Sequence, residues 1–252
     1  MAAAASVAKA DYGIDAPLIA RGWLGRAGWS LAGGLVFWLM NRREYPGPAI
    51  QVFAALALVA IVCAGIAWWK IRSSREGKLA LREQLLDRLA LKGDEKVLDI
   101  GCGRGLLAIG AAKRLKTGKV TGIDLWDPRV LSDNSADAAK ENAKAEGVAD
   151  RVRFETGDAR RLVYPDGNFD AVISANALHA LDDDRERERA LKEALRVLKP
   201  GGRLVIFDTA DTAYYADVLR ACGAQDVTPS AWAFLWGLPS RSVAARKSSA
   251  SS

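Results

Sequence analysis

The chain has few residues of the kinds that build metal centres or disulfide frameworks. Its 252 residues include three cysteines, Cys63, Cys102 and Cys222, and a single histidine, His179. The cysteines lie far apart and lack the paired spacing of a zinc site or of a small disulfide-rich domain. We therefore expect no metal site, and the cysteine usage suits a reducing compartment.

The larger, C-terminal part of the chain also lacks a surplus of positive charge. Residues 1–75 carry eight Lys or Arg against three Asp or Glu, whereas residues 76–252 carry 28 against 27. An enzyme that acts on nucleic acid is expected to carry its positive patch on the binding domain. Nucleic acid is therefore not an expected partner. Basic residues beside apolar runs are instead typical of the cytoplasmic edge of a membrane segment.

Two long apolar runs lie in the N-terminal part. Residues 49–69 contain no charge and would span about 31 Å as a helix, enough to cross a bilayer. Residues 23–40 are interrupted by Arg26, so this run either crosses or lies in the membrane interface. We expect a flexible leader at residues 1–22 and a membrane anchor at residues 23–72, formed by a hairpin of helices 23–40 and 49–69.

The charges around these runs predict an orientation. If both runs cross, only Arg42 and Arg43 lie on the side of the connecting loop. The side that holds the N-terminus and the remainder of the chain carries seven cations, namely Lys9, Arg21, Arg26, Lys70, Arg72, Arg75 and Lys78. Because cytoplasmic flanks carry the excess of Lys and Arg, we expect the C-terminal domain to face the cytoplasm from an inner or plasma membrane.

The rest of the chain is organised around a strand that ends in three glycines. The apolar residues 96–100 are followed by Gly101, Gly103 and Gly105, and a helix is expected directly from Leu106. Such a turn lets a ligand approach the backbone beside the first N–H groups of the helix. The dinucleotide pattern GxGxxG needs glycine at position 106, so an NAD-dependent reductase is disfavoured.

Strands alternate with helices from residue 96 to residue 224, which predicts an α/β fold with a doubly wound, mostly parallel sheet. We expect seven strands, the last one antiparallel, in a domain over residues 76–247, followed by a disordered tail at residues 248–252. Ligands bind at the carboxyl ends of the strands in such sheets. Asp124 and Asp158 follow the second and third strands, so we expect both near the glycine turn.

An acidic residue, Asp99, followed by GxGxG resembles the first motif of the class I, Rossmann-like S-adenosylmethionine-dependent methyltransferases. Two later segments, FDAVISANALHAL and RVLKPGGRLVIFD, are similar to those of bacterial small-molecule members. The resemblance implies S-adenosyl-L-methionine as cofactor, with Asp124 accepting the ribose hydroxyls and Asp158 contacting the adenine amino group. The cofactor-binding residues that it implies are Asp99, Gly101, Cys102, Gly103, Gly105, Asp124, Leu125, Asp158, Ala159 and Asn176.

His179 lies just after the fourth strand, where the substrate pocket of that family opens. An imidazole there could remove a proton from a hydroxyl or thiol nucleophile. A pocket wall or a purely structural role is equally open. The pattern NPPY or DPPY, used after this strand by some amino-group methyltransferases of nucleic acids and proteins, is absent, because the chain reads SANA at residues 174–177.

The expected anchor favours a substrate that partitions into lipid, such as a quinone precursor, an isoprenoid, a lipid or an apolar thiol. We therefore predict a membrane-anchored methyltransferase that acts on a small, lipophilic substrate, with the lipid bilayer as a second partner. The alternative is a membrane-tethered protein that binds the cofactor without turnover, as an adaptor or sensor. The cofactor residues alone do not separate the two.

Overall fold

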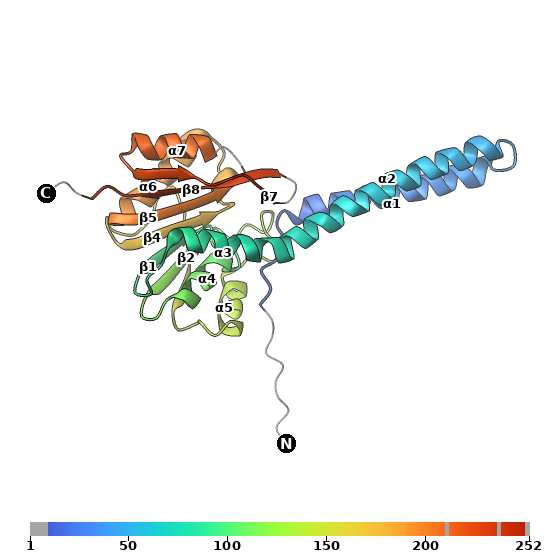
Figure 1. Cartoon of the computed structure of the whole chain (residues 1–252). Coiled ribbons are helices and arrows are strands. Elements are labelled where there is room, and N and C mark those ends of the chain that lie inside the picture. Colours follow the sequence, from blue (N-terminus) through green and yellow to red (C-terminus); the bar gives the residue numbers. More distant parts are fainter. Residues whose placement is uncertain (1–9, 210–211, 236–237, 250–252) are drawn as a thin grey trace, which may run out of the picture.

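A long helical hairpin projects from an α/β domain in the computed structural model, which describes residues 10–209, 212–235 and 238–249 (Figure 1). Helix α1 covers Pro17–Asn41 and helix α2 covers Pro46–Arg72. Each begins with proline, which suits a first helical turn because the N–H that proline lacks would have no partner there. The two helices pack along each other at Gly34, where a Cβ would lie 3.1 Å from the Leu56 side chain.

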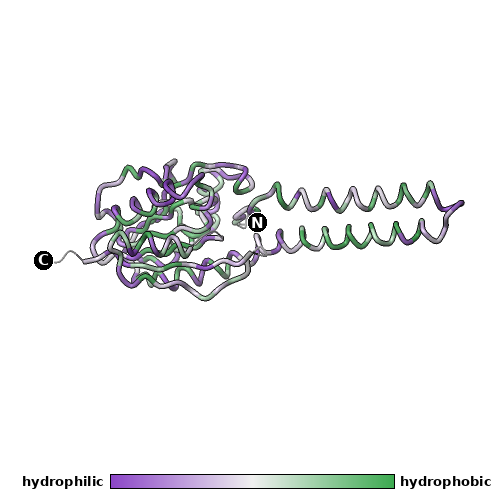
Figure 2. Tube along the Cα trace, turned by 90° about the horizontal axis from the view of Figure 1, so that it is seen from above, coloured by the Kyte–Doolittle hydropathy of each residue, from purple (hydrophilic) through white to green (hydrophobic). Residues whose placement is uncertain are grey.

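Both expected apolar helices form, and each is longer than its apolar run. Their outer surfaces present large apolar side chains, including Trp29 at 81% exposure and Ile61 at 68%. Figure 2 shows hydrophobic residues along both arms of the hairpin. Among the described residues, the helical stretch Pro46–Leu89 is the one that is long and apolar enough to cross a membrane.

Helix α2 continues into the domain without a loop. A π-helical turn, Ser73–Gly77, joins it to helix α3, Lys78–Leu89. Helix α3 ends at Leu89, before the first glycine that follows it, Gly93. Ala90 adopts a left-handed conformation (φ 50°) and its N–H reaches back to carbonyls of the last turn. The left-handed residue that ends this helix is therefore an alanine, where glycine is the usual residue.

The flexible leader expected over residues 1–22 is corrected by the structure. Residues 10–16, here called the strap, lie against the domain, and residues 17–22 belong to α1. The side chain of Asn142 holds the strap by accepting from the Asp11 N–H (2.9 Å) and donating to the Asp11 carbonyl (2.8 Å). Residues 1–9 lie outside the described residues, as do residues 250–252 of the expected tail.

The domain is built on one mixed sheet of order β3-β2-β1-β4-β5-β8-β6, and a short β7 pairs with β8. The strands are β1 Lys96–Ile100, β2 Lys119–Asp124, β3 Val152–Thr156, β4 Phe169–Ala175, β5 Leu198–Asp208, β6 Gln225–Pro229, β7 Ala233–Leu235 and β8 Leu238–Arg246. Strands β1 to β5 are parallel, and β8 is antiparallel to β5 and β6. The predicted doubly wound, mostly parallel α/β sheet with an antiparallel last strand is confirmed, but the described residues form eight strands rather than seven, because the short β7 is added beside β8.

Helices cover both faces of the sheet (Figure 1). They are α4 Leu106–Arg114, α5 Ala136–Ala145, α6 Asp184–Val197 and α7 Thr212–Ala221, with a 3-10 turn at Leu178–Ala180. One apolar core lies between the sheet and α3, α4 and α5, and the other between the sheet and α6 and α7. Strands β2 and β3 lie on one side of β1, and β4 and β5 lie on the other. The strand order therefore reverses between β1 and β4, and a ligand crevice is expected at the carboxyl ends of these two strands.

Candidate active site

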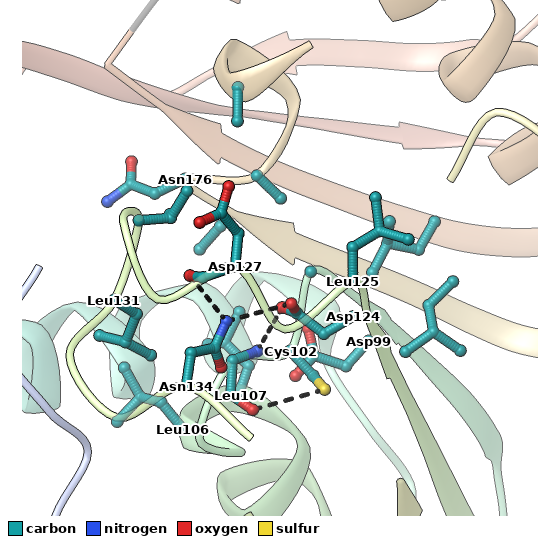
Figure 3. A pocket seen from close by; sticks show the side chains of 18 of the residues that line it. Asp99, Cys102, Leu106, Leu107, Asp124, Leu125, Asp127, Leu131, Asn134 and Asn176 are labelled. Atoms are coloured by element: carbon teal, nitrogen blue, oxygen red, sulfur yellow. Dashed lines mark hydrogen bonds between the residues drawn. The ribbon is translucent and has the colours of Figure 1, made fainter. Parts of the chain in front are cut away.

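A pocket of about 240 Å³ opens at the carboxyl ends of β1 to β4 (Figure 3). Its wall comes from the glycine turn after β1, from the loops after β2, β3 and β4, and from the strap and α3. The two carboxylates expected at the ends of β2 and β3, Asp124 and Asp158, both line it. The parallel sheet therefore brings together the strand ends that the sequence pointed to.

The glycine turn brings backbone to the pocket wall because Gly101 and Gly103 carry no side chain. Gly101, Gly103 and Gly105 all have positive φ, at 72°, 51° and 85°. A Cβ on Gly101 would lie 2.2 Å from the Cβ of Ala177, so another residue would push the turn away from the loop after β4. Gly101 and Gly103 line the pocket, whereas Gly105 lies outside the lining and precedes α4, where it faces Ile109.

Cys102 fixes the turn to the neighbouring strand. Its N–H and that of Gly101 donate to the Ile123 carbonyl at 3.0 and 2.9 Å. Its side chain lines the pocket but is buried. Burial raises the pKa of the Cys102 thiol well above its usual value, so this cysteine presents a neutral thiol rather than a nucleophilic thiolate.

Asp99 is buried at the floor of the pocket. Its Oδ2 accepts from the Ala108 N–H at 2.8 Å, in the first turn of α4, while Oδ1 has no partner among the described residues. Burial raises the pKa of Asp99 to about 8. Burial thus favours the neutral form of this carboxyl group.

Asp124 ties the loop after β2 to the glycine turn (Figure 3). Its Oδ2 accepts from the Gly103 N–H at 2.8 Å. Its Oδ1 accepts from the Trp126 N–H at 2.6 Å and from the Asn134 side chain at 3.2 Å. Leu125, the next residue, also lines the pocket. Since each carboxylate oxygen has two acceptor sites, Oδ2 keeps capacity for a ligand hydroxyl.

Asp158 and Ala159 form the β3 side of the pocket. Both carboxylate oxygens of Asp158 accept from the Arg160 guanidinium, at 2.7 to 3.0 Å. These hydrogen bonds hold the pKa of Asp158 below its usual value. Asp158 is therefore an ionised acceptor that Arg160 holds in place at the edge of the pocket.

Asn176 closes the β4 side. Its backbone is in the left-handed region (φ 51°), and its N–H donates to the Phe207 carbonyl at 2.9 Å. The side-chain Oδ1 is buried and has no partner among the described residues. Because buried acceptors are normally satisfied, this oxygen is suited to a donor supplied by a ligand.

His179 pairs with a carboxylate at the end of β5. Its Nδ1 lies 2.8 Å from Asp208 Oδ1, and its backbone N–H donates to Asp208 Oδ2 at 3.0 Å. Asp208 is buried and also accepts from the Tyr215 hydroxyl at 3.3 Å. The hydrogen bond to Asp208 raises the pKa of His179. The imidazole itself is outside the pocket lining, although its neighbours Leu178 and Ala180 belong to it.

The strap supplies a wall that sequence reasoning missed. Tyr12 and Asp15 line the pocket together with Lys78 of α3. The buried Lys78 Nζ donates to the carbonyls of Tyr12 and Gly13, both at 2.7 Å, and lies 3.4 Å from Asp15 Oδ2. Burial lowers the pKa of Lys78. No periodic pattern in residues 10–16 announces these contacts.

Residues 97–202, which include the glycine turn and the strand ends described above, match a family model described as a methyltransferase domain. These residues are therefore similar to a methyltransferase domain, and the Asp99-GxGxG motif within them resembles that of the class I, S-adenosylmethionine-dependent group. The cofactor of the chain is S-adenosyl-L-methionine, as the resemblance in the first motif implied.

Curated relatives resemble this methyltransferase domain rather than the whole chain. Methyltransferase GfsG of Streptomyces halstedii is 37% identical over 141 residues, which are 56% of this chain and 47% of the relative. A demethylmenaquinone methyltransferase of Lactiplantibacillus plantarum is 36% identical over 130 residues, 51% of each protein. The chain thus spans about half the length of the curated relatives that it matches.

Solved structures share the fold at lower identity. A geranyl diphosphate C-methyltransferase from Streptomyces coelicolor, solved with S-adenosyl-L-homocysteine, has a TM-score of 0.54 at 17% identity, covering 71% of this chain and 82% of its own. The [4+2]-cyclase SpnF has a TM-score of 0.57 at 22% identity, covering 70% and 84%. Because one neighbour is a cyclase, the fold alone does not decide the reaction.

The pocket of the methyltransferase domain fits its cofactor. The glycine turn brings its backbone to the pocket wall, and the Oδ1 atoms of Asp99 and Asn176 are buried without a partner among the described residues. One acceptor site of Asp124, on Oδ2, remains for a hydroxyl group. Both oxygens of Asp158 already accept from Arg160, so the expected contact of Asp158 with the adenine amino group stays a prediction. These residues would hold the cofactor between the ends of β1 to β4.

Proposed function

We propose that the chain is a membrane-anchored methyltransferase that transfers the methyl group of S-adenosyl-L-methionine to a small, lipophilic substrate. The observation that carries the proposal is the position of the cofactor pocket. Its wall includes the strap, and the strap leads directly into α1 of the apolar hairpin. A pocket at the base of a membrane anchor is well placed to receive a substrate from lipid.

The hairpin is the proposed anchor. The large side chains exposed along it are mostly apolar, whereas soluble proteins rarely expose apolar surface over so long an element. Trp68 and Trp69 lie at its domain end and are followed by Lys70 and Arg72, the sequence of an aromatic belt and a positive cytoplasmic flank. The proposed location is an inner or plasma membrane with the methyltransferase domain in the cytoplasm.

Methyl transfer depends more on how the acceptor atom is positioned than on a strong acid or base in the protein. The bound cofactor supplies an electrophilic methyl group, and the protein's task is to align an acceptor with it and to exclude water. His179 is held by Asp208 through Nδ1, and Nε2 has no partner among the described residues. That nitrogen is available to take a proton from an acceptor hydroxyl or thiol at the pocket margin.

A quinone precursor is one substrate class consistent with this proposal. Two of the matched relatives are named demethylmenaquinone methyltransferases. The apolar part of the pocket wall, which includes Leu106, Leu131 and Leu181, suits a ring or an isoprenoid chain better than a polar metabolite.

Product formation tests the proposal. Membranes that contain the full chain should convert S-adenosyl-L-methionine to S-adenosyl-L-homocysteine when lipid extract is supplied, and Asp124→Asn should slow this conversion. If calorimetry shows cofactor binding but no extract supports turnover, the protein is instead a membrane-tethered cofactor-binding adaptor or sensor. Binding of NADH without binding of the sulfonium would contradict both functions.

A further inference from the structure

The pocket has an apolar edge that remains exposed. Leu125 and Val130 lie in the loop after β2 and belong to the pocket wall. Leu125 is nevertheless 58% exposed and Val130 39%. Large aliphatic side chains that are grouped at the mouth of a pocket and exposed to water are typical of an interaction surface.

Backbone hydrogen bonds place this edge at the foot of the hairpin. The Ala16 N–H donates to the Val130 carbonyl at 2.9 Å, and Asp15 forms a bridge with Leu131. Ala16 directly precedes α1. In the first turn of α1, Leu18 and Ile19 are 61% and 52% exposed. The exposed apolar residues of the loop and of the helix therefore lie together, and we call Leu18, Ile19, Leu125 and Val130 the lip.

One hydrogen bond, to the π-helical turn that follows α2, shows at which level of the hairpin the lip lies. The Asp15 N–H donates to Ser74 Oγ at 3.2 Å. Ser74 lies only about 8 Å along the helix beyond Trp69, the last residue of the uncharged run. The interfacial layer on each side of a bilayer core is roughly 5–7 Å thick. If the uncharged run fills the core, the lip is at the headgroup layer.

Charge at the same level favours an anionic surface. Arg21, Arg72 and Arg75 are exposed around the foot of the hairpin, and the one acid among residues 70–78 is Glu76, which pairs with Arg72 at 3.0 Å. Basic segments next to a membrane helix are attracted to anionic lipids of the cytoplasmic leaflet.

We propose that the lip is seated in the headgroup layer of an anionic bilayer, so that the mouth of the cofactor pocket opens into lipid. A substrate with an apolar body then enters from the membrane along Leu125 and Val130 without crossing water. This inference rests on the membrane anchor of the proposed function, and it adds how the domain is seated on the bilayer and where the substrate enters.

Site-directed spin labelling of the full chain measures the depth of the lip directly. In a Cys222→Ala background, where Cys63 and Cys102 are buried, single labels are attached through Val130→Cys or Leu18→Cys. Leu58→Cys in α2 serves as the reference inside lipid, and Lys116→Cys, exposed near the start of β2, as the reference in water. Each variant is reconstituted in phosphatidylcholine nanodiscs with and without phosphatidylglycerol.

Collision rates with oxygen and with a polar nickel chelate report the surroundings of each label. The oxygen-to-nickel ratio at residues 130 and 18 should exceed that at residue 116 several-fold, remain below that at residue 58, and rise with phosphatidylglycerol. If the ratios at residues 130 and 18 equal the ratio at residue 116 while residue 58 is in lipid, the lip does not lie in the headgroup layer, although the hairpin is still a membrane anchor. If the ratio at residue 58 also equals that at residue 116, the hairpin does not enter lipid, and the proposed membrane anchor is contradicted as well.

Discussion

At the scale of single residues, Asp99 is the group whose state depends most on what the pocket holds. Burial raises its pKa to about 8, so the folded protein keeps a proton that the unfolded chain loses near pH 4. The contribution of Asp99 to stability therefore falls as the pH rises from about 4 to about 8. A nearby cation favours the ionised carboxylate, and the cofactor carries a sulfonium and an ammonium group.

We therefore expect S-adenosyl-L-methionine to displace a proton from Asp99 when it binds near pH 7. Titration calorimetry in buffers of different ionisation enthalpy should give binding heats that vary with the buffer. In Asp99→Asn, which has no proton to release, that dependence should disappear. Equal heats for the unmodified chain in phosphate and Tris would show that Asp99 does not change its ionisation on binding.

His179 is expected to act as a base that Asp208 orients. Replacing it by Gln should lower kcat by about 10²–10⁴-fold, the usual contribution of such a base. Because the Asp208 hydrogen bond raises the pKa of His179, and the neutral imidazole is the active form, the rate should rise with pH through that pKa. Asp208→Asn should move this limb to lower pH.

A pH–rate profile of the three proteins checks this expectation. If His179→Gln keeps both the rate and the acid limb, the imidazole is a pocket wall or a structural group. The pairing itself could not be predicted from the sequence. His179 and Asp208 are far apart in the chain, and only the parallel neighbours β4 and β5 bring their loops together.

At the scale of elements, the strap joins the anchor to the cofactor pocket. Lys78→Met would leave the carbonyls of Tyr12 and Gly13 without their buried donor. The expected cost is about 1–3 kcal/mol of stability, together with weaker cofactor binding because part of the pocket wall loosens. Thermal unfolding and cofactor titration measure the two effects.

Lys140→Met is the matched control for the strap, because Lys140 is exposed on α5 and pairs only with Asp137 among the described residues. It should change stability by less than about 0.5 kcal/mol. Equal behaviour of the two variants would mean that the buried lysine does not hold the strap.

The end of α3 offers a second test at this scale. Ala90 is left-handed (φ 50°), a conformation that costs a residue with a Cβ about 1–2 kcal/mol. After the greater entropy of glycine in the unfolded chain is allowed for, Ala90→Gly should stabilise the protein by about 0.5–1 kcal/mol. Ala80→Gly, within the same helix, should destabilise it by about 1 kcal/mol. Denaturant unfolding distinguishes a gain from a loss.

These elements also show where prediction from sequence succeeds and where it ends. Strand and helix order was predictable because apolar runs and glycine or proline turns mark it locally, and the strand ends gave Asp124 and Asp158. The strap was not predictable, because its partners Lys78 and Asn142 lie more than 60 residues away. The end of α3 at Leu89 was not predictable either, because the residue in the left-handed conformation there is Ala90 and not a glycine.

At the scale of the whole molecule, two parts with different surfaces meet at one point. The methyltransferase domain has a charged exterior and buries its apolar residues on both faces of the sheet. The hairpin instead exposes them (Figure 2). The cofactor pocket lies where the parts join, since the strap forms its wall and leads into α1. This arrangement leads us to expect transfer of the methyl group into the membrane phase.

The most direct measurement follows the methyl group itself. Membranes that contain the full chain are given S-adenosyl-L-methionine labelled in its methyl group and are then extracted with organic solvent. We predict that the label enters the organic fraction, and that equal amounts of the Asp124→Asn protein transfer much less. Label that remains in water-soluble compounds, or no release of S-adenosyl-L-homocysteine, would contradict a methyltransferase that draws its substrate from lipid.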